Sequence, residues 1–224
     1  MHETPKIFAL CGQPKSGKTT LARILEKRLG YQIIDDALPI RSIAAEYFGL
    51  SLIDVVTQDG KSKQFEFMGR QWTVRQILGE IGNALEDKFG ANVFPELAYR
   101  RICRMMKRKS IEHFVVPSVR RDQGIFWKSK GAIVVEIYNP NVSVSTFEFD
   151  QYNKSVVDIR LVNDFDLRGM LHVDKEHSRL YDRFVKQVQK KLIEEIRSGV
   201  SHGGFVQNVP EHMPQTLSCD ESVL

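Results

Sequence analysis

Short apolar runs alternate with longer segments of helical periodicity along most of this chain. The apolar runs lie at residues 7–11, 31–35, 113–116, 132–138 and 156–162. Apolar residues recur three and four positions apart at residues 19–29, 38–48, 73–89 and 92–107, and we expect a further short helix within 120–130. This alternation is typical of parallel strands joined by helices. It predicts a three-layer α/β fold with a mostly parallel sheet of about five strands.

The remaining segments are less regular. Residues 65–72 alternate around Gly69 and Arg70 and predict a small hairpin, whereas the polar stretch 58–64 is equally consistent with a mobile loop. Residues 176–197 predict a terminal helix, and residues 198–224 lack periodicity and predict a disordered tail. We therefore expect one domain over residues 1–197, with a helical insertion at about 37–110 between the second and third strands.

Composition narrows the class of protein. The 224 residues, 42% of them hydrophobic, can bury one substantial core. The 32 Lys and Arg residues exceed the 28 Asp and Glu residues only slightly, so the charge suits a compact polyanionic ligand as well as any nucleic acid. Cys11, Cys103 and Cys219 lack the spacing of metal ligands. No apolar run approaches the roughly 20 residues of a membrane span, and no signal peptide opens the chain, so we expect a cytoplasmic protein.

A phosphate-binding motif follows the first apolar run directly. Residues 12–19 read G-x-x-x-x-G-K-T, and an ordinary glycine-rich turn would not explain the lysine and the hydroxyl together. Glycines let the backbone close around a triphosphate, Lys18 reaches its β- and γ-phosphates, and the Thr19 hydroxyl can bind Mg²⁺ at a helix N-terminus. The expected contacts with ATP come from Gly12, Lys15, Ser16, Gly17, Lys18, Thr19 and Thr20.

Charged residues follow two other expected strands. Arg120 and Arg121 come after the third strand, at the sheet edge where open α/β folds bind ligands. Such guanidinium groups neutralise a transferring phosphoryl group or hold an acceptor phosphate, and no glutamate follows this strand to activate water. We expect the functional arginine to be Arg120 and Arg121 to pair at the surface. Asp35 and Asp36 end the second strand, where one of them either holds Mg²⁺ through water or caps the next helix.

Four blocks of sequence together resemble a known family. They are GQPKSGKTT at 12–20, ALPIRSIAAEYFG at 37–49, WTVRQILGEIGN at 72–83 and VVPSVRRD at 115–122, with a weaker fifth block, VDIRLVNDFDLRGML, at 157–171. In this order they resemble the deoxynucleoside monophosphate kinases of large tailed bacteriophages, in the nucleoside monophosphate kinase branch of phosphate-loop proteins. The resemblance covers most of residues 6–195. It implies a phosphate-loop kinase fold and ATP-dependent, Mg²⁺-assisted phosphorylation of a deoxynucleoside monophosphate to the diphosphate.

The resemblance also assigns residues. It implies catalytic roles for Lys18, Arg75 and Arg120, with Arg75 holding the acceptor phosphate, and a donor-adenine contact for Asn163 in the turn Asn163-Asp164. The expected acceptor site comprises Ala37, Leu38, Arg41, Arg75, Asn83, Phe94 and Ser118. Because a monophosphate already presents an ionised oxygen, catalysis would need positioning and charge neutralisation rather than a general base.

Two departures from the family pattern bear on this assignment. Ser118 stands where the family usually has an aspartate, and a hydroxyl cannot supply charge to a metal or a base edge. We therefore make no prediction of which base the acceptor carries. Pro14 and Lys15 stand where relatives often carry two basic residues, which leaves Lys15 alone to assist.

Two other functions remain open from sequence. One is another small-molecule kinase of the same branch, acting on dephospho-coenzyme A or a nucleoside. The other is a nucleotide-dependent binding module or ATPase that transfers nothing and uses the basic stretch 100–109 on nucleic acid. We favour a solvated helix face for that stretch, because its charges interleave with an apolar stripe. We therefore expect small-molecule nucleotides as partners, no membrane and no nucleic acid; a homodimer is compatible with the sequence.

Overall fold

The computed structural model describes residues 5–109, 111–164, 186–187 and 190. The expected tail at 198–224, and nearly all of the expected helix at 176–197, fall outside the described residues.

A five-stranded, wholly parallel sheet forms the centre of the molecule. Its strand order is β2-β5-β1-β6-β7. The strands are β1 (Lys6–Cys11), β2 (Gln32–Ile33), β5 (His113–Val116), β6 (Ile133–Tyr138) and β7 (Ile159–Val162). The expected sheet is confirmed, although β2 and β7 are shorter than their apolar runs because the chain turns at Asp35 and forms a 3-10 turn at Lys154–Val156.

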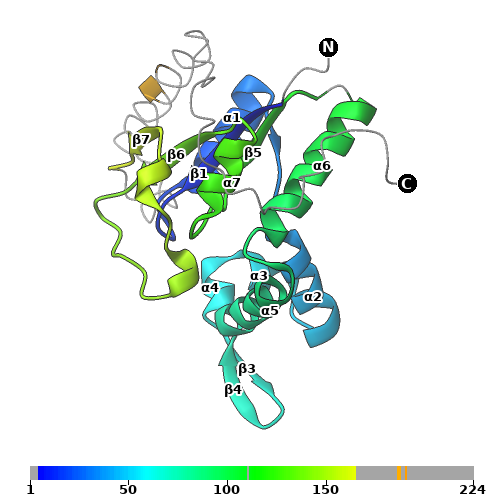
Figure 1. The fold of residues 1–224 in the computed structure, drawn as a ribbon. Helices are drawn as coiled ribbons and strands as arrows, with labels where there is room; N and C mark the ends of the chain where they lie inside the picture. The colour runs from blue at the N-terminus through cyan, green and yellow to red at the C-terminus, as the bar shows by residue number, and fades with distance from the viewer. Residues whose placement is uncertain (1–4, 110, 165–185, 188–189, 191–224) are drawn as a thin grey trace.

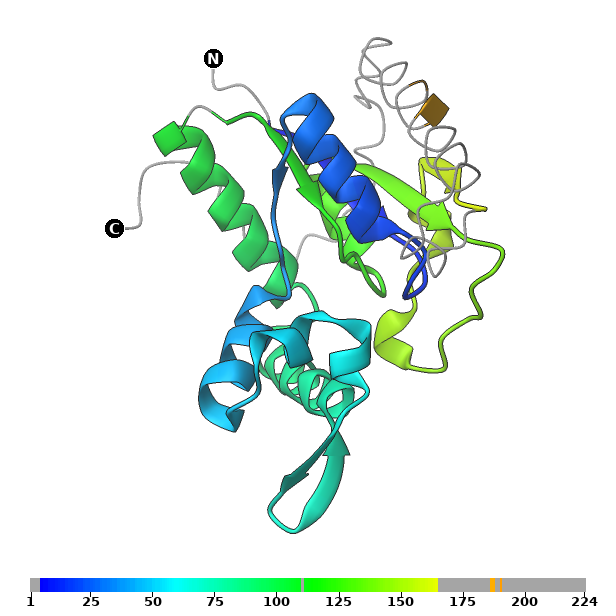
Figure 2. The ribbon, with the colours of Figure 1, turned by 180° about the vertical axis from the view of Figure 1, so that it is seen from behind.

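Helices cover both faces of this sheet. Helix α1 (Lys18–Leu29) lies on one face, and α6 (Val93–Lys109) and α7 (Gln123–Ser129) lie on the other (Figures 1 and 2). Alternate residues of β1 serve the two sides: Phe8 packs in the cluster that contains Leu21 and Leu25 of α1. Ala9 packs in the cluster of Ile102 and the fully buried Trp127. This two-residue alternation is why a central parallel strand is apolar throughout.

The segment between β2 and α6 forms a lobe below the sheet, as Figures 1 and 2 show. It contains α2 (Leu38–Phe48), α3 (Leu52–Val56), α4 (Gln58–Lys61), the hairpin strands β3 (Gln64–Phe67) and β4 (Arg70–Thr73), and α5 (Val74–Phe89). A small core of its own holds the lobe together, made of Ala44, Leu50, Val55, Val74 and Ile77. The lobe thus stands against the carboxyl edge of the sheet as a compact unit.

Local capping explains the parts of this lobe that periodicity missed. The hairpin is confirmed, with Met68 and Gly69 at positive φ in its turn. The stretch 58–64 is no loop, because it contains α4 and the start of β3. The Ser51 hydroxyl accepts from the backbone N–H of Asp54 at the start of α3, and the Thr57 hydroxyl accepts from that of Gly60 at the start of α4. Caps of this kind stabilise helices too short to show a period.

The segment between β6 and β7 runs down from the sheet to this lobe. Figures 1 and 2 show its 3-10 turn Glu148–Asp150 beside α4. No helix in the described part of the chain has both the length and the apolar character that crossing a membrane requires.

Candidate functional site

The phosphate loop between β1 and α1 has the backbone that its glycines predict. Gly12 and Gly17 have φ angles of 138° and 110°. A β-carbon on Gly12 would lie 2.4 Å from the carbonyl oxygen of Ile137, and one on Gly17 would lie 2.5 Å from the Asn163 side-chain nitrogen. Both positions therefore exclude side chains by conformation and by contact. Lys15 also has positive φ, at 67°, which is uncommon for a residue other than glycine.

Helix α1 begins immediately after this loop and leaves its first N–H groups for an anion. Gly17 is its N-cap residue, and no side chain caps it. Free N–H groups and the helix dipole favour a phosphate at this end. Thr19 in the first turn is exposed and lines the neighbouring cleft.

Lys18 is folded back onto the loop. Its Nζ donates to the carbonyl oxygens of Gly12 at 2.6 Å and Gln13 at 2.8 Å. Burial, followed by the positive charge of Arg120, lowers the pKa of Lys18 to about 8. The charge of Arg120 thus acts on Lys18, and an anion bound near both side chains would stabilise both charges.

Asn163 braces the phosphate loop from β7. Its Nδ2 donates to the carbonyl oxygen of Ser16 at 2.7 Å, and its side chain is buried. In this structure Asn163 thus holds the loop itself, and its expected contact with donor adenine stays a prediction. Ser16 Oγ and Asn163 Oδ1 are buried without a hydrogen-bond partner among the described residues.

Two pockets open at this edge of the sheet. The first, which we call the loop cleft, runs along the phosphate loop and the start of α1, and the segment 139–150 forms its other side. Its lining residues are Pro14, Lys15, Gly17, Lys18, Thr19, Thr20, Val56, Gln58, Ser62, Arg75, Asn139, Asn141, Val142, Ser143, Val144, Ser145, Phe147 and Asp150.

The second, which we call the arginine pocket, lies between the lobe and the ends of β2 and β5. Its lining residues are Asp36, Ala37, Ile40, Arg41, Lys61, Arg75, Leu78, Gly79, Gly82, Asn83, Glu86, Phe94, Ser118, Arg120, Arg121 and Gln123.

The arginine pocket carries an excess of positive charge. Five basic side chains line it against two acidic ones, Asp36 and Glu86. The basic residues are Arg41, Lys61, Arg75, Arg120 and Arg121. Burial and the charges of Arg41, Arg120 and Arg75 lower the pKa of Lys61 to about 8. Such a cluster of cations favours a multiply charged anion.

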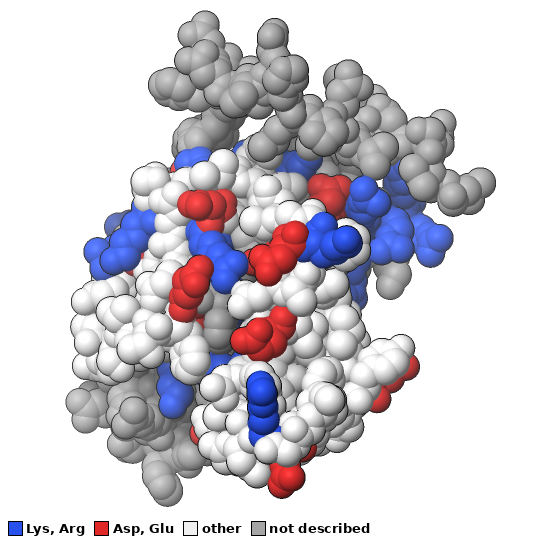
Figure 3. Space-filling view, turned by 60° about the horizontal axis from the view of Figure 1, so that its bottom comes forward, with Lys and Arg blue, Asp and Glu red and all other residues white. Residues whose placement is uncertain are grey.

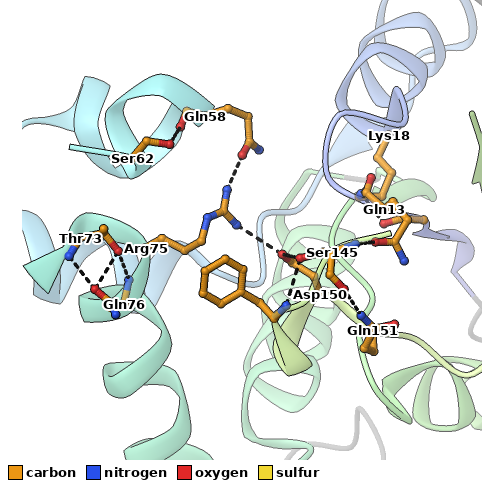
Figure 4. Close-up of polar contacts among 12 residues, drawn as sticks. Gln13, Lys18, Gln58, Ser62, Thr73, Arg75, Gln76, Ser145, Asp150 and Gln151 are labelled. Carbon is orange, nitrogen blue, oxygen red and sulfur yellow. Dashed lines mark hydrogen bonds and ion pairs between the residues drawn. The ribbon is translucent and has the colours of Figure 1, made fainter. Parts of the chain in front are cut away.

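Arg75 lines both pockets and so joins them. In Figure 4 its guanidinium extends from α5 between Gln58 and Asp150, and its Nη2 donates to Gln58 Oε1 at 2.5 Å. Its Nη1 donates to Asp150 Oδ2 at 3.3 Å, and the ring of Phe147 lies 5.5 Å from its guanidinium carbon. Arg75 is therefore placed to contact ligands in either pocket.

A chain of hydrogen bonds connects the phosphate loop to Arg75. The backbone N–H of Ser145 donates to Gln13 Oε1 at 2.8 Å, and the Ser145 hydroxyl donates to Asp150 Oδ2 at 2.8 Å (Figure 4). The same carboxylate oxygen holds Arg75. The segment between β6 and β7 thus links the two pockets through polar contacts.

The two aspartates after β2 have separate contacts. Asp35 Oδ1 accepts from the backbone N–H of Ala37 at 3.1 Å in the turn before α2, and its carboxylate pairs with Arg41. Asp36 is buried and accepts a hydrogen bond from the Ser118 hydroxyl. Neither aspartate caps α2, whose N-cap residue Ala37 has no side-chain cap hydrogen bond, and the expected Mg²⁺ role stays a prediction.

Most of the expected acceptor residues line the arginine pocket. Ala37, Arg41, Arg75, Asn83, Phe94 and Ser118 all do so, and the expected catalytic residue Arg120 lines it as well. Leu38 does not: it lines neither pocket and its side chain is 44% exposed, because α2 turns it outward. The expectation that Leu38 contributes to this site is not supported.

Arg121 and Lys61 are pocket residues that sequence reasoning missed. We expected Arg121 at the surface, yet Asn83 Oδ1 accepts from its Nη2 at 3.0 Å and Glu86 pairs with its Nη1 at 2.5 Å. Its φ of 43° turns it into the pocket, a conformation that the sequence does not signal. Lys61 ends a helix of four residues without periodicity.

A bound Mg²⁺ would rely mainly on phosphate oxygens. Among the described residues, no group of three or more His, Cys, Asp or Glu side chains could hold a metal ion. Mg²⁺ commonly takes few protein ligands beside substrate phosphates and water. The exposed Thr19 hydroxyl beside Lys18 fits that minimal donor set.

The basic stretch on α6 contains one ion pair along the helix. Arg100 Nε pairs with Glu96 Oε1 at 3.0 Å, one turn earlier. On the face that Figure 3 draws, acidic and basic side chains are interspersed at the centre, and basic side chains gather at the right-hand edge. The solvated helix face expected for this stretch stays a prediction.

Comparisons with known proteins place the chain by its fold alone. No family model matches it, and no curated protein sequence does. Among solved structures it is similar to TT1252 from Thermus thermophilus (16% identity, TM-score 0.45, covering 87% of this chain and 99% of that one). It is also similar to a dephospho-CoA kinase from Campylobacter jejuni (16% identity, TM-score 0.40, covering 86% of this chain and 98% of that one). A third similar structure is shikimate kinase from Aquifex aeolicus (15% identity, TM-score 0.38, covering 86% of this chain and 99% of that one). At these identities and TM-scores the likenesses carry no argument about substrate or activity.

Proposed function

We propose that this protein is an ATP-dependent deoxynucleoside monophosphate kinase. The observation that carries the proposal is the pair of adjoining pockets that share Arg75, one built on the phosphate loop and one lined by five cations. A reaction that moves a phosphoryl group between two anionic substrates needs this arrangement. The four ordered sequence blocks support the choice of a nucleoside monophosphate as acceptor.

In the proposed reaction the γ-phosphate of ATP binds at Lys18 and the N-terminus of α1. An ionised phosphate oxygen of the acceptor attacks the γ-phosphorus, the bond to the bridging oxygen breaks, and ADP and the deoxynucleoside diphosphate leave. The acceptor needs no general base. Mg²⁺, held by Thr19 and phosphate oxygens, would neutralise charge on the transferring group.

The arginine pocket would take the acceptor phosphate. Arg75 lies at the junction of the pockets, and the charge of Arg120 acts on Lys18, so both can stabilise negative charge that develops between the substrates. An acceptor that already carries a phosphate fits the five cations better than an uncharged nucleoside does. This favours a monophosphate over a nucleoside as substrate.

A screen of phosphoryl transfer tests the proposal. Purified protein, ATP and Mg²⁺ are incubated with the common deoxy- and ribonucleoside monophosphates, dephospho-coenzyme A and nucleosides, and ADP formation is followed. We expect turnover with at least one deoxynucleoside monophosphate and none stimulated by DNA. Turnover only with dephospho-coenzyme A or a nucleoside would assign another kinase of the branch, and ATP hydrolysis stimulated by DNA alone would contradict a kinase.

Two variants locate the reaction in the pockets. Lys18→Ala should lower kcat by about 100-fold or more while the fold persists, since it removes a charge from the transferring phosphate. Arg75→Ala should raise the KM for the acceptor more than the KM for ATP. Equal effects on both KM values would show that Arg75 has been assigned to the wrong substrate.

A further inference from the structure

Asp36 and Ser118 meet in the turns that directly follow the paired strands β2 and β5. The paired residues are Gln32 with Phe114 and Ile33 with Val115. The backbone N–H of Ile34 also donates to the carbonyl oxygen of Val115. The two chains thus leave the sheet side by side, and the Ser118 hydroxyl donates to Asp36 Oδ1.

The Asp36 carboxyl lies at the edge of the arginine pocket and makes few contacts with other side chains of the fold. It is 5% exposed and lines the pocket beside Ala37 and Ile40. Among the described residues, Ser118 is the only side chain that hydrogen-bonds to it, since Arg41 pairs with Asp35 instead. A buried carboxylate is costly unless its oxygens are satisfied, so the remaining acceptor capacity of Asp36 is suited to a ligand.

Charge decides which part of an acceptor would meet this carboxylate. A phosphate would be repelled by Asp36 and attracted by the cations elsewhere in the pocket. A metal ion there would meet the positive charges of Arg41 and Arg120, both of which act on Asp36. An uncharged N–H or O–H group is the partner that remains, and the buried ring of Phe94 in the same pocket offers a surface for a base.

We propose that Asp36, positioned by Ser118, accepts a hydrogen bond from the uncharged end of the acceptor nucleotide and so determines acceptor affinity. The donor is an N–H group of the base or the 3′-hydroxyl of the sugar. This inference rests on the proposed function. It also accounts for the serine at 118: this chain carries the carboxylate in the turn after the neighbouring strand, hydrogen-bonded to Ser118.

The titration of Asp36 is consistent with this role. Burial raises the pKa of Asp36 to about 6, while the Ser118 hydrogen bond and the charges of Arg120 and Arg41 oppose the shift and Asp35 adds to it. The carboxyl is therefore ionised at neutral pH and becomes protonated below about pH 6.

Steady-state kinetics on four proteins test the proposal at pH 7.5 with each deoxynucleoside monophosphate. They are the wild type, Asp36→Asn, Ser118→Ala, and the exchange Asp36→Ser with Ser118→Asp. We expect Asp36→Asn to raise the KM for the acceptor by about 10- to 100-fold, as for loss of a hydrogen bond to a charged group, with the KM for ATP unchanged. Ser118→Ala should raise the KM for the acceptor by a smaller factor. The exchange should recover most of the loss, because it returns a carboxylate to the same edge.

Asp122→Asn is the matched control, since Asp122 lines neither pocket and contacts Asn153 instead. Thermal unfolding and ATP binding show whether each variant is folded. An acceptor KM that Asp36→Asn leaves unchanged, or a parallel rise in the KM for ATP, would overturn the inference while leaving the kinase intact. A wild type that phosphorylates no nucleoside monophosphate would overturn both proposals.

A second set of acceptors separates the two hydrogen-bond donors. If the penalty of Asp36→Asn disappears with the 2′,3′-dideoxy form of the acceptor, the 3′-hydroxyl is the donor. If the penalty persists, the donor is on the base.

Discussion

Arg75 of the lobe is held by Asp150 of the segment between β6 and β7, with Nη1 and Oδ2 3.3 Å apart. Both side chains are largely buried, 16% and 8% exposed. The carboxylate of Asp150 thus pairs with the guanidinium group that we expect to bind the acceptor phosphate.

Replacing Asp150 should strengthen acceptor binding. In Asp150→Asn the acceptor phosphate no longer competes with a carboxylate for Arg75, and we expect the KM for the acceptor to fall by roughly 3- to 10-fold, in keeping with a partly buried ion pair. Steady-state kinetics at low salt measure the change, with Asp122→Asn as the control. An unchanged or higher KM would show that Asp150 helps Arg75 to bind the acceptor.

Triphosphate binding should take up protons at alkaline pH. The pKa of Lys18 is about 8, so at pH 8.5 most of the free protein carries a neutral Lys18, and a bound polyphosphate would raise this pKa and recharge the amine. Calorimetry of a non-hydrolysable ATP analogue in buffers of different ionisation enthalpy should show uptake at pH 8.5. Lys18→Arg, which stays charged, is the control; equal uptake in both proteins would assign the protons elsewhere.

The two partly buried lysines Lys18 and Lys61 should also make the free protein more stable as the pH rises. Lys18 and Lys61 have pKa values of about 8 when folded, against 10.5 for the ordinary side chain. Between these values the unfolded chain binds more protons, so the contribution of these lysines to the free energy of unfolding increases with pH. Urea unfolding at pH 8.0 and 9.5, compared for the wild type and Lys61→Met, checks the sign. A larger increase in the variant would contradict it.

Gly17→Ala should abolish triphosphate binding. The alanine would have to adopt a φ of 110°, and its β-carbon would lie 2.5 Å from the Asn163 side-chain nitrogen, so the loop must shift. Gly30→Ala is a matched control, because Gly30 also has positive φ, at 71°, but nothing lies within 4 Å. We expect the control to lose about 1–2 kcal/mol of stability and keep binding. Fluorescence titration with a labelled ATP analogue distinguishes them, and binding by Gly17→Ala would refute the loop geometry.

Asn163→Ala should weaken the binding of all nucleoside triphosphates to the same extent. Its side chain contacts the Ser16 carbonyl, so we expect about a 10-fold loss for both ATP and GTP through a less ordered phosphate loop. Competition titrations with the two nucleotides measure this. A loss confined to ATP would instead support the expectation that Asn163 contacts adenine.

The pattern of apolar residues was sufficient to predict the sheet, because strands and long helices leave a period in the sequence. Residues 113–116 form β5, and residues 38–48 form α2, with the predicted bounds. Helices α3 and α4 were missed, since five and four residues are too few to show a helical period. The positive φ of Arg121 was missed because only glycine signals that conformation in advance.

The sequence alone determined the phosphate loop, because Gly12, Gly17 and Lys18 act through backbone conformation and a side chain within one short segment. Only the tertiary structure decided how the second pocket is composed. The adjacency of β2 and β5 brings the turn with Asp36 to the turn with Ser118, and the path of the chain after β6 brings Asp150 to Arg75. These pairs are 82 and 75 residues apart in sequence, and no local pattern records a contact that depends on how separate elements pack.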